Sequence, residues 1–172
     1  MKKFLFASVL ATLAAMAFAS SASATISSPA PGGSVTGSGN VTFRGNILST
    51  SCAIRVGATV ATTTTANITS AAFTGCGSLA TLTVLGLPGT PWRKSITLSP
   101  RNFTITGVQV RVQVPFVLDC LYSGSLSGTY TVGANSRLTI TADALSLVRA
   151  TTGDCSRDPT VTGSITTNAT TV

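Results

Sequence analysis

The stretch "NFTITGVQVRVQV", Asn102 to Val114, alternates apolar and polar residues as a half-buried β-strand does. Phe103 and Ile105 occupy odd positions, but the valines at 108, 110, 112 and 114 occupy even positions. One extra residue at Gly107 explains the change, because a β-bulge sets two residues of one strand opposite a single residue of its partner. The stretch predicts a long strand with a bulge at Gly107 that bends around a closing sheet.

The chain from Val41 onward continues this pattern in shorter runs rich in Thr, Val, Ile, Ala and Gly. Turn signals such as "GLPGTP", "YSGS", "GANS" and "TTGD" separate the runs at intervals of about ten residues. Only "ADALSLVRA", residues 142–150, has a pattern compatible with a short helix. The sequence therefore predicts an all-β fold, either a single antiparallel β-sandwich or a small β-barrel.

The N-terminal part has the composition of an export signal. Lys2 and Lys3 precede an apolar run that ends in small residues at Ala22-Ser23-Ala24. This run is shorter than the ~20 residues that cross a bilayer, so we expect a signal peptide at 1–24 and no transmembrane segment. Residues 25–40 are rich in Ser, Gly and Pro and are interpreted as a flexible leader before an all-β domain at 41–172. The protein is thus expected to be secreted, extracellular or attached to the surface of a bacterial cell.

Four cysteines, Cys52, Cys76, Cys120 and Cys155, are the most informative polar residues. Secreted small domains use an even number of cysteines mainly for disulfides. The chain has no histidine and no glutamate, and the cysteines lack the paired spacing of a zinc site, so no metal and no other cofactor is expected. The simplest of the three connectivities joins Cys52 to Cys76 and Cys120 to Cys155. The glycines on both sides of Cys76 would let its backbone approach a neighbouring strand.

A catalytic site is difficult to assemble from the remaining residues. A second disulfide could bring Asp119 close to Asp154 and Asp158, and paired carboxylates can hydrolyse sugars. Aspartates beside turns and prolines, however, usually form turn hydrogen bonds. We therefore predict that the protein is not an enzyme.

The segment "PWRKS", residues 91–95, joins Trp92 to Arg93 and Lys94. It could hold a sugar against the indole while the cations meet an acidic head group. A partly buried Trp92 that closes one end of a barrel is the simpler interpretation. The formal charge of the whole chain is +7, but the arginines are scattered along it, which argues against nucleic-acid binding.

Several segments in order resemble a known family. They are "ITSAAFTGCGSLATLTVLGLPGTPW" (68–92), "FTITGVQV" (103–110), "GSLSGTY" (124–130) and "DCSRDPTVTGSITT" (154–167). Together with the cysteines they resemble the secreted activators of rhamnolipid-dependent alkane oxidation, over about residues 39–167. Here "GTP" separates "GLP" from Trp92, which departs from the tighter form expected of the family.

The resemblance implies an extracellular, non-enzymatic protein that helps cells use alkanes together with a glycolipid surfactant. It also implies a place at the cell surface or in the biofilm matrix, with an adhesive role there. An anionic glycolipid would be its partner, with Trp92, Arg93 and Lys94 as contacts for the head group.

A second resemblance, to subunits of chaperone-usher fimbriae, rests on "GNVTFRGNILSTSCAI", Gly39 to Ile54. It implies that the N-terminal leader is a donor strand for the next subunit, so that the isolated domain is incomplete and self-assembles. The leader offers Ile26 and Val35 for this purpose and few large apolar residues between them. A fimbrial subunit or adhesin is therefore the alternative to the activator.

Overall fold

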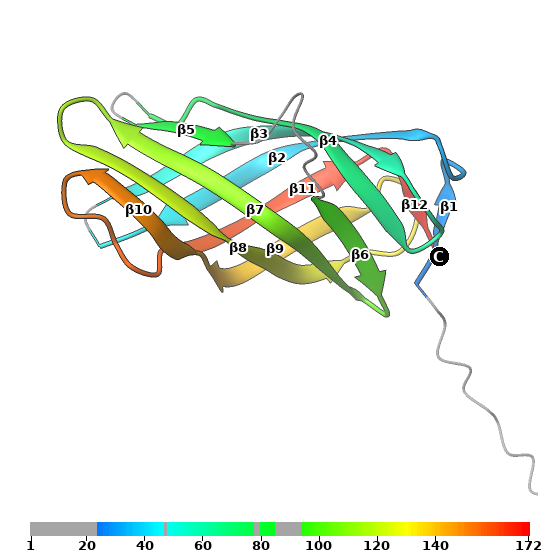
Figure 1. The fold of residues 1–172 in the computed structure, drawn as a ribbon. Coiled ribbons are helices and arrows are strands. Elements are labelled where there is room, and N and C mark those ends of the chain that lie inside the picture. Colours follow the sequence, from blue (N-terminus) through cyan, green and yellow to red (C-terminus); the bar gives the residue numbers. More distant parts are fainter. Residues whose placement is uncertain (1–23, 47, 78–79, 85–93) are drawn as a thin grey trace, which may run out of the picture.

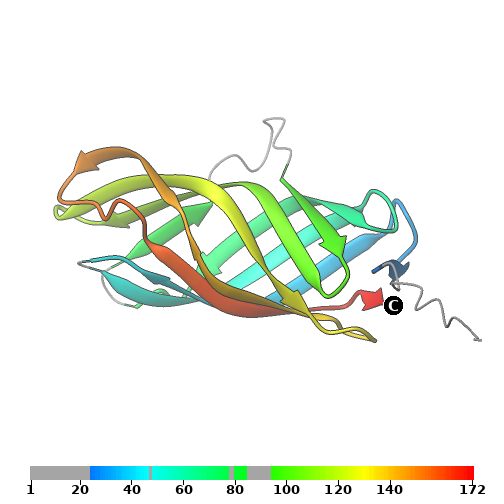
Figure 2. The same cartoon turned by 90° about the horizontal axis from the view of Figure 1, so that it is seen from below.

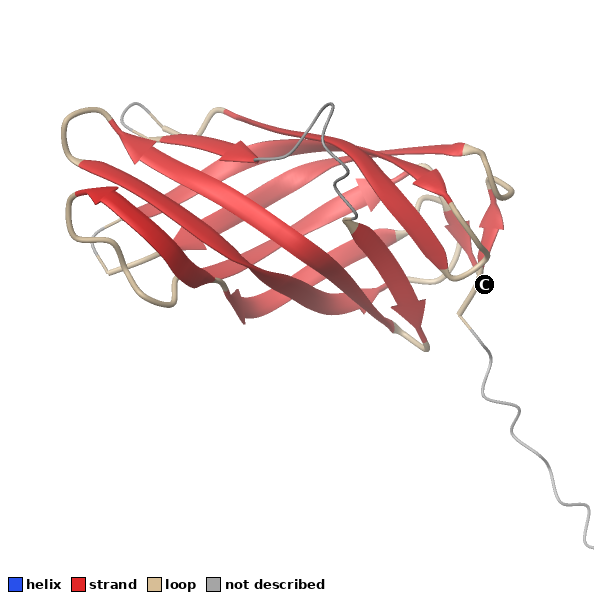
Figure 3. Ribbon diagram, in the orientation of Figure 1, coloured by secondary structure: helices blue, strands red, loops and turns tan. Residues whose placement is uncertain are grey.

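The computed structural model describes residues 24–46, 48–77, 80–84 and 94–172. The described residues form strands, turns and loops without a helix, so the all-β prediction is confirmed (Figure 3). The strands are β1 (Ile26–Ser28), β2 (Ser34–Arg44), β3 (Ser49–Val60), β4 (Thr65–Thr74), β5 (Thr81–Val84), β6 (Ser95–Ser99), β7 (Asn102–Val114), β8 (Leu118–Tyr130), β9 (Arg137–Ala144), β10 (Ser146–Thr152), β11 (Thr160–Thr167) and β12 (Thr170–Thr171).

Eight antiparallel strands close into a barrel (Figures 1 and 2). The ring runs in the order β8, β9, β11, β2, β3, β4, β6 and β7, and the pairing of β7 with β8 completes it. Both β7 and β8 are 13 residues long and extend beyond the strands beside them. β5 pairs with the far part of β7, and β10 pairs with the far part of β8. The barrel, one of the two architectures expected, is therefore the one observed.

The bulge predicted in β7 is present. The register between β7 and β8 shifts between Ile105 and Val108, and Gly107 has a φ of 68°. Phe103 and Ile105 are buried before the shift, and the valines at 108, 110 and 112 are buried after it. A single extra residue thus keeps the apolar side chains inside the barrel while the strand bends.

Residues 34–40, expected to belong to a flexible leader, instead form the first part of β2. This strand pairs with β3 through eleven residue pairs and with β11 through eight. A Cβ on Gly39 would lie 1.9 Å from the carbonyl oxygen of Ser164 in β11. Glycine is required here because two strands approach closely, a use of glycine that composition does not distinguish from a linker.

Residues 142–150 do not form a helix either. β9 ends at Ala144 and β10 begins at Ser146, and the side chain of Leu145 between them is fully buried. The backbone N–H of Leu145 donates to the carbonyl oxygen of Pro159 at 3.0 Å. Tertiary pairing overrides the weak helical pattern of this short segment.

The first and last strands lie side by side at one end of the barrel. β1 pairs with β12, and the N–H of Thr25 donates to the carbonyl oxygen of Val172 at 3.0 Å. The fimbrial resemblance implies that the N-terminal leader is a donor strand for the next subunit, but its residues 34–40 lie in β2, between β3 and β11 of the same chain. The barrel therefore differs from the incomplete fold that this resemblance implies.

Among the described residues, no helix has the length and hydrophobicity needed to cross a membrane.

A disulfide joins Cys52 in β3 to Cys76, with a distance of 4.2 Å between their Cα atoms. Gly75 and Gly77 have φ values of 63° and 83°, and a Cβ on either would meet no atom within 4 Å. The two glycines are therefore needed for their backbone conformation and not for lack of space. The hydroxyl of Thr50 donates to the carbonyl oxygen of Cys76, which fixes the turn against β3.

Candidate functional site

The turn between β7 and β8 projects from one end of the barrel, and β1, β12 and the C-terminus lie at the opposite end (Figure 1). It consists of Pro115, Phe116 and Val117. The N–H of Val117 donates to the carbonyl oxygen of Val114 at 3.0 Å and closes the turn. Phe116 is fully exposed and Val117 has an exposed fraction of 58%, so the tip of the longest hairpin presents an aromatic ring and an aliphatic side chain to solvent.

Phe116 also has a φ of 63°, a conformation that bulky residues rarely adopt. The strain is local, and such outliers concentrate at binding and switching sites. A glycine or asparagine would form the same turn at lower cost. An exposed phenylalanine in this position therefore calls for a functional explanation.

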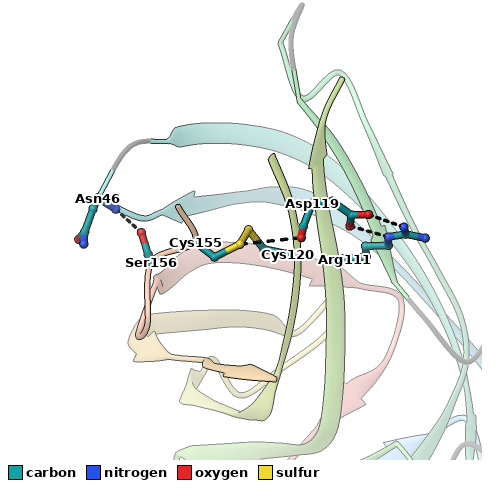
Figure 4. The surroundings of a disulfide bond; sticks show 6 residues. All are labelled: Asn46, Arg111, Asp119, Cys120, Cys155 and Ser156. Carbon is teal, nitrogen blue, oxygen red and sulfur yellow. Dashed lines mark hydrogen bonds and ion pairs between the residues drawn. A yellow bond between two sulfur atoms is a disulfide. The ribbon is translucent and has the colours of Figure 1, made fainter. Parts of the chain in front are cut away.

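The second disulfide supports this hairpin close to its turn. Cys120 in β8 is opposite Val112 of β7 and Ala150 of β10, and its bond to Cys155 spans 5.9 Å between Cα atoms. Both observed disulfides thus match the simplest connectivity expected from the sequence. Next to Cys155, the hydroxyl of Ser156 accepts a hydrogen bond from the N–H of Asn46 (Figure 4). The disulfide and this hydrogen bond connect the β8, β10–β11 and β2–β3 segments at one end of the barrel.

An ion pair lies on the outer side of the same hairpin. The guanidinium of Arg111 donates from Nε to Asp119 Oδ1 at 2.8 Å and from Nη2 to Oδ2 at 2.6 Å (Figure 4). These hydrogen bonds hold the pKa of Asp119 below its ordinary value, and the nearby charge of Arg149 acts in the same direction. Asp119 therefore stays ionised near neutral pH and is poorly suited to act as a general acid.

The two-carboxylate hypothesis gains no support from this arrangement. The Asp119 carboxylate is occupied by Arg111, whereas Asp154 and Asp158 lie in the loop that follows β10. Within the part of the chain that the structure describes, no group of three or more Cys or Asp side chains could hold a metal ion. This end of the barrel therefore combines the apolar hairpin tip with the cationic side chains of Arg111 and Arg149.

The other predicted contacts lie elsewhere. Trp92 and Arg93 fall outside the described residues. Lys94 was expected at the surface, but it is only 3% exposed, because it directly precedes β6 and faces inward. Burial lowers the pKa of Lys94 to about 7. Its ammonium group is therefore not at the surface to meet a surfactant head group.

The sequence contained a signal for Phe116 that the pattern of alternation concealed. In "VQVPFVLDC", residues 112–120, an uninterrupted apolar run stands where two strands must be joined by a turn. Hairpin turns are normally polar and rich in Gly, Asn or Asp. An apolar run at a turn is the observation that marks the hairpin tip.

These features define a class of protein, a disulfide-bonded β-barrel whose longest hairpin carries an exposed apolar tip. The chain belongs to the PraA/PraB-like alkane oxidation protein activator family, whose family model matches residues 1–172. No curated protein and no solved structure matches the chain significantly. The family describes an activator of alkane oxidation, which agrees with the expected non-enzymatic role.

Proposed function

We propose that this protein is secreted and assists alkane use from outside the cell, at the surface between hydrocarbon and water. In this role it acts together with an anionic glycolipid surfactant, on the cell surface or in the biofilm matrix, and catalyses no reaction itself. Family membership supports the link to alkanes. The two disulfides, the positive formal charge (+7 for the whole chain, including Lys2 and Lys3 of the expected signal peptide) and the export-like N-terminus support secretion and an affinity for anionic partners.

The observation that carries the interfacial role is the tip formed by Phe116 and Val117. Aromatic and aliphatic side chains are typical of segments that insert into the boundary between water and hydrocarbon. Arg111 and Arg149 both lie opposite Leu121 of β8, close to the turn of the hairpin, where an anionic head group would meet them. Arg111 forms an ion pair with Asp119, so Arg111, Arg149 and Asp119 together carry a net positive charge.

Replacement of Phe116 by Ser tests this role. Burying a phenylalanine side chain contributes about 1.5–3 kcal/mol, so adsorption to a hexadecane–water interface should weaken by about tenfold or more. Val132→Ser is the matched control, because Val132 is 60% exposed in the turn between β8 and β9. Interfacial tension measured against protein concentration separates the two variants, and their melting temperatures show whether each one folds.

The biological assay adds purified protein to a deletion strain growing on hexadecane with rhamnolipid. Oxidised wild-type protein and Val132→Ser should restore growth, whereas Phe116→Ser and a reduced, alkylated sample should restore it poorly. Equal rescue by Phe116→Ser would show that the tip is not the part that works at the interface. Absence of rescue by the wild-type protein would overturn the proposed function as a whole.

A further inference from the structure

The interior of the barrel contains two adjoining cavities lined mainly by apolar side chains, with volumes of about 80 and about 70 Å³, and Lys94 also lines the second. Val56, Ile68, Ile105 and Ile165 line both cavities, which places the two in succession inside the ring of strands. The first extends from these residues toward Ile26 and Thr171, near the end of the barrel that carries β1, β12 and the C-terminus (Figure 1). The second extends toward Phe73, Val84 and Val161.

Small side chains account for the unfilled space. The interior of an eight-stranded barrel is just wide enough to be filled by side chains or to hold one small ligand. Ala58 and Ala66 line the first cavity, and Ala71 lines the second. Larger aliphatic residues at these positions would fill the space, so the choice of alanine keeps it open.

The hydroxyl protons in the lining of the first cavity are already engaged in hydrogen bonds within the protein. Its polar lining consists of Ser136, Thr167 and Thr171. The hydroxyls of Ser136 and Thr171 are 2.8 Å apart, and that of Thr167 donates to the carbonyl oxygen of Ser136 at 3.0 Å. These groups satisfy one another, and an apolar cavity of this kind stays dry and takes up apolar guests.

The shape of the space selects among apolar guests. Each cavity is about half the size of an engineered cavity of about 150 Å³ that binds benzene or xenon. A rigid ring therefore fits neither cavity well, whereas a flexible chain can extend from one into the other past the four shared residues. We propose that the barrel interior binds a linear saturated hydrocarbon chain.

The pairing of the wall indicates where such a chain reaches the interior. β4 pairs with β6 only through Thr65, Ala66 and Asn67, and the next link is a hydrogen bond from the N–H of Ile68 to the carbonyl oxygen of Lys94. Among the described residues, the later part of β4 has ladder partners only in β3. The second cavity borders this seam through Ala71, Val84 and Lys94.

This inference rests on the proposed function in one respect, since the link to alkanes makes a saturated chain the natural guest. The test uses oxidised, full mature protein with methyl groups labelled for NMR, equilibrated with n-octane vapour. Bound octane should shift the methyl signals of Ile68, Ile105 and Ile165 and raise the melting temperature. Cyclohexane, a ring of the same chemical class, should shift them several-fold less at equal saturation.

Two alanine variants on the same strand provide matched controls. Ala71→Leu places a larger side chain in the second cavity and should reduce octane binding at least tenfold. Ala72→Leu adds the same atoms at the adjacent, exposed position and should leave binding unchanged. If Ala71→Leu fails to fold, Ala66→Val reduces the first cavity by a smaller step and should lower octane affinity severalfold.

Octane and octanoate distinguish the chain itself from a carboxylate-bearing amphiphile. Octane should bind at both pH 6 and pH 9. Binding of octanoate alone, or methyl shifts confined to residues outside the barrel, would overturn it. Octane binding by a wild-type protein that fails to rescue growth would overturn the proposed function and leave the cavity assignment standing. Rescue of growth by a wild-type protein that does not bind octane would overturn the cavity assignment and leave the proposed function standing.

Discussion

Gly39→Ala is the sharpest test of how β2 sits in the barrel. The added Cβ would lie 1.9 Å from the carbonyl oxygen of Ser164 and 2.8 Å from the Cα of Ile165. Both contacts are with backbone atoms, so no side-chain rotation relieves them. β2 must therefore move away from β11, with which it forms eight residue pairs.

The cost of this movement has two parts. Overpacking typically costs about 1–3 kcal/mol, and each ladder hydrogen bond that breaks beside Ser164 costs roughly 1 kcal/mol more. We expect Gly39→Ala to lower the free energy of unfolding by about 3–5 kcal/mol, and the melting temperature by roughly 10 °C for a domain of this size. Urea unfolding of the oxidised protein, followed by circular dichroism, measures the difference.

Gly57→Ala in the neighbouring strand β3 is the control. Its Cβ would lie 2.5 Å from the hydroxyl oxygen of Ser70, an exposed side chain that can rotate away. This variant should stay within about 1 kcal/mol of the wild type, because alanine also reduces the entropy of the unfolded chain. Equal stabilities for Gly39→Ala and the wild type would refute the pairing of β2 with β11 and restore the flexible leader.

Three further predictions concern the disulfides, a buried hydroxyl and a buried amine. Cys120→Ser with Cys155→Ser should lower the free energy of unfolding by about 4 kcal/mol in the loop-entropy model, because the bond spans 35 residues; denaturant titration with and without reductant checks this. Among the described residues, the hydroxyl of Tyr130 is the one buried side-chain polar atom without a hydrogen-bond partner. Tyr130→Phe should therefore leave the melting temperature unchanged or raise it. A fall of several degrees in the melting temperature would contradict this. The pKa of Lys94 is about 7 in the folded protein against an ordinary 10.5, so between these pH values the unfolded chain binds more protons than the folded protein. The free energy of unfolding should therefore rise from pH 7 to pH 10. Lys94→Met should remove this part of the pH dependence, and parallel stability profiles for the variant and the wild type would disprove it.

The strand content, the bulge at Gly107 and the arrangement of the disulfides followed from local patterns. Alternation with period two is a property of a single strand, and a change of parity at a glycine is visible without knowing the partner strand. Cysteines close in sequence are also often close in space when short antiparallel strands follow one another. Sequence alone could thus identify an all-β, disulfide-bonded domain.

The role of the glycines in 34–40 could not be determined in this way. A glycine in a linker and a glycine at a close contact between strands look the same in composition, and only the position of Ser164, more than a hundred residues later, distinguishes them. The exposure of Phe116 likewise depends on where β7 turns back into β8. The inward orientation of Lys94 depends on how β6 pairs with β4.

The sequence by itself determined the class of fold, because strand formation and disulfide spacing depend on residues near one another in the chain. Only the tertiary structure decided that the sheet closes into a barrel, which requires β7 to pair with β8 while β2 pairs with the distant β11. Closure created both candidate sites, since it aligned the small side chains around one interior and projected the tip of the longest hairpin beyond its rim. These are long-range consequences of register, and no local pattern specifies them.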